Sequence, residues 1–173
     1  MNKKVIDIMK GILEREYDIS LEVEYSSELK AGVLGCAQKL SKEKYKIQMA
    51  ENIEIPDDWE ILKIYSGIPK EIVIEHALVH EFCHIFDFCN EINTHHSPTI
   101  RENTVEYFAE YLAWLIILGN ESLATDFADK YAHMRWPFFT EHARKGLRCA
   151  ADVLFYRFGD EFSQITEIYQ HAR

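Results

Sequence analysis

Apolar positions in the first part of the chain recur with two different periods. Over residues 3–17 they return every three or four positions and share one helical face (Val5, Ile8, Met9, Ile12 and Leu13). Residues 19–25, ISLEVEY, alternate apolar and polar side chains, as a half-buried strand does. Residues 31–50 have two arms, AGVLGCAQKL and YKIQMA, on either side of the polar turn SKEK, which is typical of a hairpin. These patterns predict one helix followed by three short strands.

The remainder of the chain has helical patterns separated by breaks. Residues 52–69 contain two prolines, a glycine and the cluster DDW, so we expect a loop there. One long helix is predicted from about Pro69 to Cys89, and a second from Pro98 to Gly119. Three further helices are expected at 121–134, 138–158 and 160–171. Short strands followed by many helices favour an α+β domain with a small antiparallel sheet.

Composition narrows the class of protein. A chain of 173 residues with 47% hydrophobic and 28% charged residues fits one globular domain. A net charge of −10 without a basic cluster argues against nucleic acid or an anionic membrane as a partner, and leaves protein partners and oligomeric state open. No apolar run approaches the roughly 20 residues of a bilayer span, and the N-terminal apolar residues are too dispersed for a signal peptide. Four cysteines without a CxxC pair are expected to be reduced thiols, which favours the cytoplasm.

Residues 80–84 read HEFCH and carry the strongest chemical signal in the chain. Positions four apart on a helix share a face, so His80 and His84 can offer two imidazoles to one metal ion. Glu81 is placed to take a proton from water whose pKa a zinc ion has lowered towards about 7. The spacing therefore indicates a hydrolytic zinc site with Glu81 as its catalytic base.

The helix around this motif is apolar, which makes its polar residues expensive to bury alone. A metal ion would satisfy the two imidazoles and the carboxylate in such a place. The alternative interpretation is a set of core histidines hydrogen-bonded to nearby carboxylates. His76 lies one turn before His80, and we expect it to support the site or the core, because three successive helical turns do not ligate one ion comfortably.

The stretch that directly follows the motif offers poor ligands. Position 90 is Asn and position 87 is Asp, so the extended histidine motif of metzincin-like proteins is absent. His95 and His96 are available in the polar loop, but solvent-exposed loop histidines are the simpler explanation for them.

The helix expected at 98–118 supplies better candidates for the third ligand that a catalytic zinc needs. Glu102, Glu106 and Glu110 fall four apart on one side of it. Thr99 to Glu102 matches a capping box, which gives Glu102 a local role. We therefore predict Glu106 as the third ligand and Glu110 as an acceptor that orients a ligand histidine, with Glu102 as the alternative ligand.

HEFCH together with Glu106 on a second helix resembles the gluzincins, zinc peptidases with an HExxH helix and a glutamate helix. The stretch EYFAEYLAWLI, which begins at Glu106, is similar to their glutamate-helix pattern, with Ala109 and Glu110 at the expected offsets. It also resembles the ImmA/IrrE-type phage and mobile-element peptidases, the small phage-associated HExxH proteins and the minimal gluzincins. The resemblance covers roughly residues 20–118. Phe82 and Cys83 inside the motif, and Asp87 after it, depart from the usual pattern.

The resemblance implies a zincin-like fold in which a small antiparallel sheet packs on the HExxH helix and the glutamate helix. Residues 1–173 would form one zincin-like domain, with a catalytic core at 1–118 and a helical C-terminal extension at 119–173 packed on it. An edge strand such as 44–50 would bind an extended peptide beside the metal. Family members often add a tyrosine or histidine that stabilises the oxyanion, for which the candidates are Tyr107, Tyr111, Tyr131, His133 and His142.

These inferences combine into a cytoplasmic zinc-dependent metallopeptidase that acts on a protein or peptide substrate. His80, His84 and Glu106 would bind Zn²⁺, Glu81 would activate the attacking water, and Glu110 would support a ligand. The alternative is a non-catalytic or regulatory protein-binding module on a metal-binding zincin scaffold. The large helical C-terminal third, which catalysis does not need, motivates that alternative.

Overall fold

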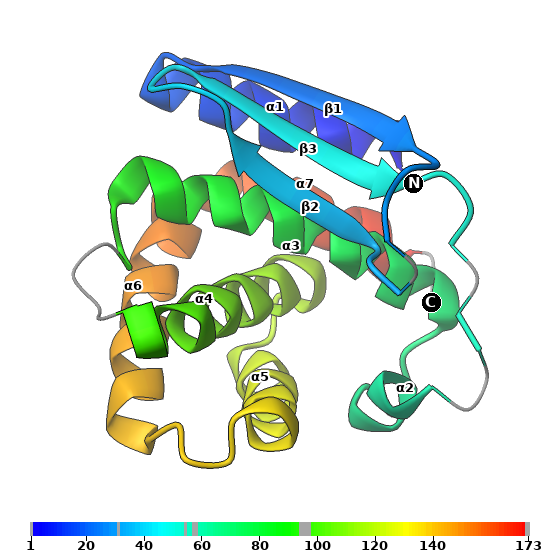
Figure 1. Ribbon diagram of the computed structural model, residues 1–173, viewed down its shortest axis with the longest axis vertical. Helices are drawn as coiled ribbons and strands as arrows, with labels where there is room; N and C mark the ends of the chain where they lie inside the picture. The colour runs from blue at the N-terminus through cyan, green and yellow to red at the C-terminus, as the bar shows by residue number, and fades with distance from the viewer. Residues whose placement is uncertain (1, 31, 54, 57–58, 94–97, 172–173) are drawn as a thin grey trace.

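The computed structural model describes residues 2–30, 32–53, 55–56, 59–93 and 98–171, which form an α+β fold (Figure 1). In chain order its elements are α1 (Lys3–Tyr17), β1 (Ser20–Ser26), β2 (Gly35–Lys39), β3 (Lys44–Ala50), α2 (Glu60–Ile64), α3 (Lys70–Asn90), α4 (Pro98–Leu118), α5 (Glu121–Arg135), α6 (Glu141–Arg157) and α7 (Gly159–Gln170). The long helices and the three strands agree with the hydrophobic pattern. The prediction of a loop at 52–69 missed α2, because a helix of five residues is too short to show a period.

The sheet is mixed, so the prediction of an antiparallel sheet was wrong. Its strand order is β1-β3-β2, with β1 parallel to β3 and β2 antiparallel to β3. The hairpin at 31–50 is confirmed, but the chain crosses from β1 to the far edge before β2 and returns as the middle strand. An alternating pattern shows which faces of a strand are buried and does not show which strand lies next to which.

The expected edge strand at 44–50 is also corrected, because β3 is the central strand. Tyr45, Ile47 and Met49 on β3 are all buried. The edge nearest to the helical layer is β2, which packs along α3 (Figure 1). The strand beside the HEFCH helix is therefore β2 and not the strand that the resemblance implied.

Helix α3 lies between the sheet and α4 (Figure 1). It begins after Pro69, which occupies the N-cap position, and ends at Glu91, whose backbone is left-handed with φ 54°. Thirteen of its residues are buried, and they include every residue of HEFCH. Because α3 is covered on opposite sides, the polar residues of HEFCH are surrounded mainly by other protein groups.

Helix α4 is the centre of the helical layer. Every residue from 107 to 118 is buried, which is the pattern of a helix covered all round. Helices α3, α5, α6 and α7 pack against it, and one continuous hydrophobic cluster joins them to α1 and the sheet. Residues after 118 thus enclose the helix that carries Glu106.

Among the described residues, none of the helices is both long enough and apolar enough to cross a membrane. The apolar stretch of α4 is buried by the neighbouring helices that cover it.

Candidate metal centre

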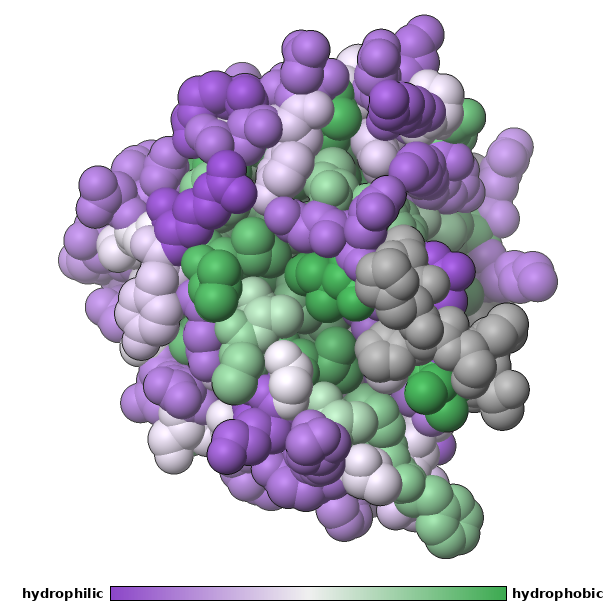
Figure 2. All heavy atoms as spheres, turned by 90° about the vertical axis from the view of Figure 1, so that its left-hand side faces the viewer, coloured by the Kyte–Doolittle hydropathy of each residue, from purple (hydrophilic) through white to green (hydrophobic). Residues whose placement is uncertain are grey.

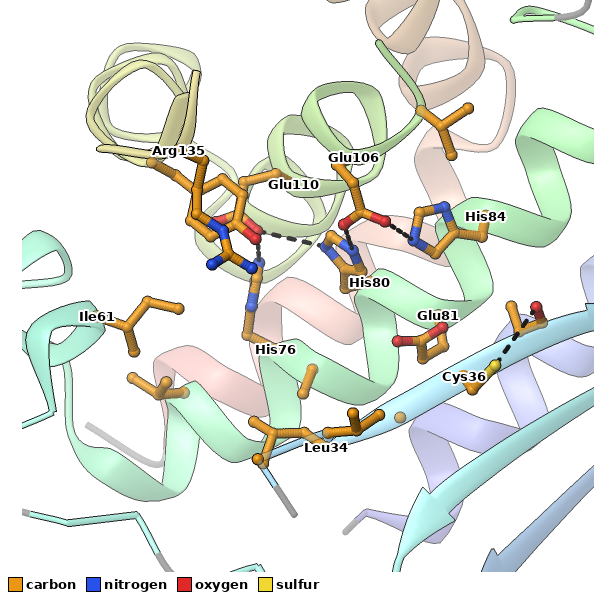
Figure 3. A pocket seen from close by; sticks show the side chains of 18 of the residues that line it. Leu34, Cys36, Ile61, His76, His80, Glu81, His84, Glu106, Glu110 and Arg135 are labelled. Carbon is orange, nitrogen blue, oxygen red and sulfur yellow. Dashed lines mark hydrogen bonds and ion pairs between the residues drawn. The ribbon is translucent and has the colours of Figure 1, made fainter. Parts of the chain in front are cut away.

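Two neighbouring helices bring the predicted site residues together. Helix α3 carries His80, Glu81 and His84, and α4 carries Glu106 and Glu110. The two histidines are one turn apart and point towards α4, where Glu106 lies between them (Figure 3). Glu81 follows His80 directly, so its side chain leaves α3 at a different angle and lies next to β2. The site therefore lies where α3 meets both α4 and the sheet.

The two oxygens of Glu106 contact both histidines (Figure 3). Oε2 lies 3.2 Å from Nε2 of His80, and Oε1 lies 3.5 Å from Nε2 of His84. Glu102, the alternative ligand, lines the same cavity but belongs to neither group of side chains that could hold an ion among the described residues. The arrangement in space thus distinguishes two glutamates that spacing alone left open.

The three groups fit a divalent cation. Bonds of about 2.1 Å at tetrahedral angles separate neighbouring ligand atoms by about 3.4 Å. The separations of 3.2 Å and 3.5 Å between Glu106 and the two imidazoles match that spacing. One ligand atom from each of His80, His84 and Glu106 lies within 4.8 Å of the other two. These buried His and Glu side chains could therefore hold a metal ion.

Glu110 is a buried acceptor behind His80. One of its oxygens, Oε1, accepts hydrogen bonds from the Tyr65 hydroxyl and from Nε1 of Trp114, the latter at 2.8 Å. Its other oxygen, Oε2, lies 3.3 Å from Nδ1 of His80. This contact is an ion pair and lacks the alignment of a hydrogen bond. With Nδ1 turned to Glu110, Nε2 of His80 faces Glu106.

His76 lies one turn before His80 on α3 and packs into the core beside the site. It is 5% exposed, and its ring stacks on Trp114 with centroids 4.1 Å apart. Its Nε2 lies 3.6 Å from Glu110. His76, His80 and Glu110 form a second group that meets the distance criterion for an ion, and it shares His80 with the first.

Burial and pairing move the pKa values of these groups in different directions. Burial, together with a smaller effect of the charge on His80, lowers the pKa of His84 to about 4. Burial acts on His80 in the same way, but its contacts with Glu106 and Glu110 outweigh that effect and raise its pKa. Burial alone would raise the pKa of Glu106, yet the hydrogen bond with His80 lowers it to about 2. The opposite shifts of His80 and Glu106 favour a charged pair at the place where a cation would bind.

Glu81 occupies a separate niche between α3 and β2. It is 9% exposed, and burial raises its pKa to about 7, against a smaller lowering by the charge of His80 and by the backbone of Ala37. The niche depends on Gly35 of β2, because a Cβ there would lie 2.7 Å from Cγ of Glu81 and 2.7 Å from Sδ of Met49. The edge strand holds the carboxylate close to the imidazole pair.

An open cavity of about 740 Å³ gives access to these groups. Its walls come from β2, α2, α3, α4 and the end of α5, and they include Tyr131 and Arg135. Figure 3 shows Leu34, which precedes β2, and Cys36 of β2 on one side and Arg135 on the other, with His80 and Glu81 between them.

The structure places the remaining candidates as follows. The hydroxyls of Tyr107 and Tyr111 donate to Asp129 and Asp152, at 2.6 Å and 2.7 Å. His133 and His142 are not among the described residues of the cavity wall, whereas Tyr131 is. His95 and His96 lie outside the described residues.

Sequence reasoning missed Gly35 and Arg135. A glycine in a hairpin arm and an arginine at a helix end give no signal of a site until another element is packed against them.

Comparison with protein-family models, curated proteins and solved structures finds no match. The likeness to the gluzincins therefore stays a prediction, and the geometry of the described residues carries the functional argument.

Proposed function

We propose that this protein is a zinc-dependent peptidase in which His80, His84 and Glu106 hold the ion and Glu81 moves the proton. The observation that carries the proposal is the position of Glu106, whose carboxylate oxygens lie 3.2 Å and 3.5 Å from the Nε2 atoms of the two histidines. Two imidazoles and one carboxylate at tetrahedral spacing are a donor set that suits zinc. Zinc in such a site lowers the pKa of a coordinated water towards about 7 and polarises a carbonyl.

Glu81 supplies the proton transfer that peptide hydrolysis needs. With a pKa of about 7, its carboxylate can take the proton of the attacking water near neutral pH. The same group can then give that proton to the amine nitrogen as the C–N bond breaks. One carboxyl group in one niche performs both transfers, so no second acid is required.

Tyr131 is the described candidate best placed to stabilise the developing oxyanion. It lies on the cavity wall, and burial raises its pKa to about 12, so the hydroxyl keeps its proton at neutral pH. A neutral hydroxyl can donate a hydrogen bond to the carbonyl oxygen as negative charge builds up there.

The metal content and peptide hydrolysis of four purified proteins test this proposal. Wild type should contain zinc by elemental analysis, and H80A should lose it. E81Q should keep its zinc and hydrolyse a quenched fluorescent peptide library about 10²–10⁴-fold more slowly, because it cannot accept the proton. E71Q makes the same substitution on an exposed part of α3 and should match wild type.

Either of two results would contradict the proposal. One is a wild-type protein that takes up no zinc, or that holds as much zinc as H80A. The other is an E81Q variant that cleaves peptides as fast as wild type. Y131F, measured alongside, should retain zinc and lower kcat by about 10²-fold if Tyr131 donates to the oxyanion.

A metal-binding regulatory module is the second candidate function. Apolar side chains gather on the face of the molecule shown in Figure 2. On α6, the side chains of Val153 and Tyr156 are 67% and 75% exposed. Exposed apolar side chains one turn apart are a feature of surfaces that bind proteins. An E81Q variant separates the two functions, because a regulatory module would keep its full biological effect when Glu81 cannot take a proton.

A further inference from the structure

One cation stands on the wall of an otherwise acidic cavity. The carboxylates among the described residues of the wall are Glu81, Glu102, Glu106 and Glu110. Arg135 is the one lysine or arginine among those residues. It lies at the end of α5, on the wall opposite β2 (Figure 3). A peptide bound over Glu81 would therefore have Arg135 on one side and the strand on the other.

The guanidinium of Arg135 is not occupied by an ion pair within the described part of the chain. No carboxylate there lies within 4.0 Å of it, and its contact is with the ring of Tyr131, 5.9 Å from the centroid. The arginines of α6 differ: Arg148 contacts Glu141 at 2.6 Å and Asp129 at 3.2 Å, and Arg144 contacts Glu141 at 2.9 Å. Arg144 and Arg148 are thus paired with carboxylates, whereas Arg135 contacts Tyr131 and, through its charge, lowers the pKa values of Tyr131 and Glu106.

Local structure holds Arg135 in place. It is the last residue of α5, where the negative end of the helix dipole favours a cation. The helix stops directly after it, because Trp136 leaves the helical backbone angles (φ −139°, ψ 73°) and Pro137 follows. The ring of Tyr131, one turn earlier, supports the guanidinium. A guanidinium held in this way loses little conformational entropy when it binds a carboxylate.

We infer that Arg135 binds a carboxylate of the substrate and makes the enzyme prefer peptides that present one near the scissile bond. This inference rests on the proposed peptidase function and adds a specificity determinant to it. A guanidinium matches a carboxylate with two parallel N–H···O bonds. Without Arg135, the glutamates of the wall would repel an anionic substrate. The carboxylate belongs either to an acidic side chain or to the C-terminus of the peptide.

A simpler role for Arg135 is to balance the charge of Glu106 and Glu110. Balance of that kind acts equally on every ligand, whereas recognition acts on ligands that carry a carboxylate. The two roles therefore differ in their effect on matched charged and neutral ligands.

Binding of zinc-chelating dipeptide hydroxamates to the zinc-loaded protein, measured by calorimetry, tests the inference without turnover. Three probes are compared: one with an aspartate side chain and an amidated end, one with an alanine and a free C-terminal carboxylate, and one with an alanine and an amidated end. They are measured on wild type, R135A, R135K and K130A. Lys130 lies on the same helix, is 52% exposed and lines no part of this cavity, so K130A is the matched control.

Wild type and K130A should bind at least one carboxylate probe about 10–100-fold more tightly than the neutral probe. R135A should lose this difference while it binds the neutral probe as wild type does. R135K should lose most of the preference for the carboxylate probe, because lysine keeps the positive charge but lacks the planar guanidinium that makes two parallel hydrogen bonds. The probe that shows the preference identifies the source of the carboxylate, a side chain or a chain end.

Equal binding of all three probes by wild type overturns the inference and leaves the peptidase proposal intact. So does a preference that persists in R135A, or an R135A variant that weakens all three probes equally. Failure of the zinc-loaded protein to bind any hydroxamate overturns the inference and the proposed zinc centre together.

Discussion

Glu106 and Glu102 lie one helical turn apart on α4, yet Glu106 reaches both histidines and Glu102 does not. The difference comes from the position of each glutamate along α4, because Glu106 lies one turn further into the helix, beside the two histidines of α3. Glu102 lies in the exposed first part of α4, where a carboxylate is well solvated. Glu106 is partly exposed and pairs with two buried imidazoles. A cation bound there would satisfy polar groups that are costly to bury without a partner.

Substitution of these two glutamates provides a matched test of the third ligand. E106Q should weaken zinc binding by more than the 10–100-fold typical of a residue that only supports a ligand. E102Q should change it by less than about 3-fold, because Glu102 does not reach the imidazoles. Competition with a chromophoric chelator measures both affinities. An E102Q variant that loses zinc while E106Q keeps it would reverse the assignment.

Glu110 shows how a single buried carboxylate can be made stable. Four polar groups surround it: the hydroxyl of Tyr65, the indole N–H of Trp114 and one nitrogen each of His76 and His80. Burial would raise its pKa, but these partners lower it, so the group stays charged. A charged acceptor at Nδ1 favours the tautomer of His80 that leaves Nε2 to the metal side.

At the scale of elements, the contact between α3 and β2 sets the position of Glu81. Helix α3 carries the whole HEFCH motif, so its periodicity alone places the two histidines on one face. The place of Glu81 depends on an edge strand that approaches the helix closely at a residue without a side chain. Gly35 is therefore a residue of the site although it has no chemistry of its own.

Replacing Gly35 by alanine should impair catalysis more than folding. The new Cβ would lie 2.7 Å from Cγ of Glu81 and 2.7 Å from Sδ of Met49, and both are flexible side chains that can move aside. We expect the free energy of unfolding to fall by about 1–3 kcal/mol and the peptidase rate to fall about 10²-fold as Glu81 shifts.

Thermal unfolding and peptide hydrolysis, measured together, check this expectation. G11A is the control, because no atom lies within 4 Å of a Cβ at that helical position. It should raise the free energy of unfolding by about 0.5–1 kcal/mol and leave the rate unchanged. A G35A variant with full activity would show that Glu81 does not depend on the strand.

At the scale of the whole molecule, the site lies inside the common core and not on a separate surface. The cavity wall draws on β2 near the N-terminus and on α5 in the last third of the chain. Helices α5, α6 and α7 also cover α4, whose residues 107–118 are entirely buried. The C-terminal helices therefore bury α4 and also supply residues of the cavity wall, among them Tyr131 and Arg135.

Removal of the metal should lower the stability of the entire domain. A ligand present at about 100 times its Kd stabilises the native state by about 2.7 kcal/mol. For a domain of this size, that corresponds to a Tm about 5–10 °C higher with zinc than without. Differential scanning calorimetry with and without a chelator measures the shift, and E106Q should show little of it. An identical Tm in both conditions would contradict a metal site within the core.

The sequence by itself determined the long helices, the three strands and the HEFCH pair of histidines. These follow from periodicity, because positions four apart on a helix must share a face wherever that helix lies. It also indicated Glu106 and Glu110, since their spacing on a second apolar helix continues the same logic. Local geometry was sufficient for each of these inferences.

Only the tertiary structure decided the order and direction of the strands, the choice of Glu106 over Glu102, and the parts that Gly35 and Arg135 play. Each depends on how two elements distant in the sequence approach one another: β3 between β1 and β2, α4 across α3, and β2 against Glu81. Hydrophobic periodicity records which face of an element is buried. It does not record which partner buries it, and the partner is what gives this site its shape.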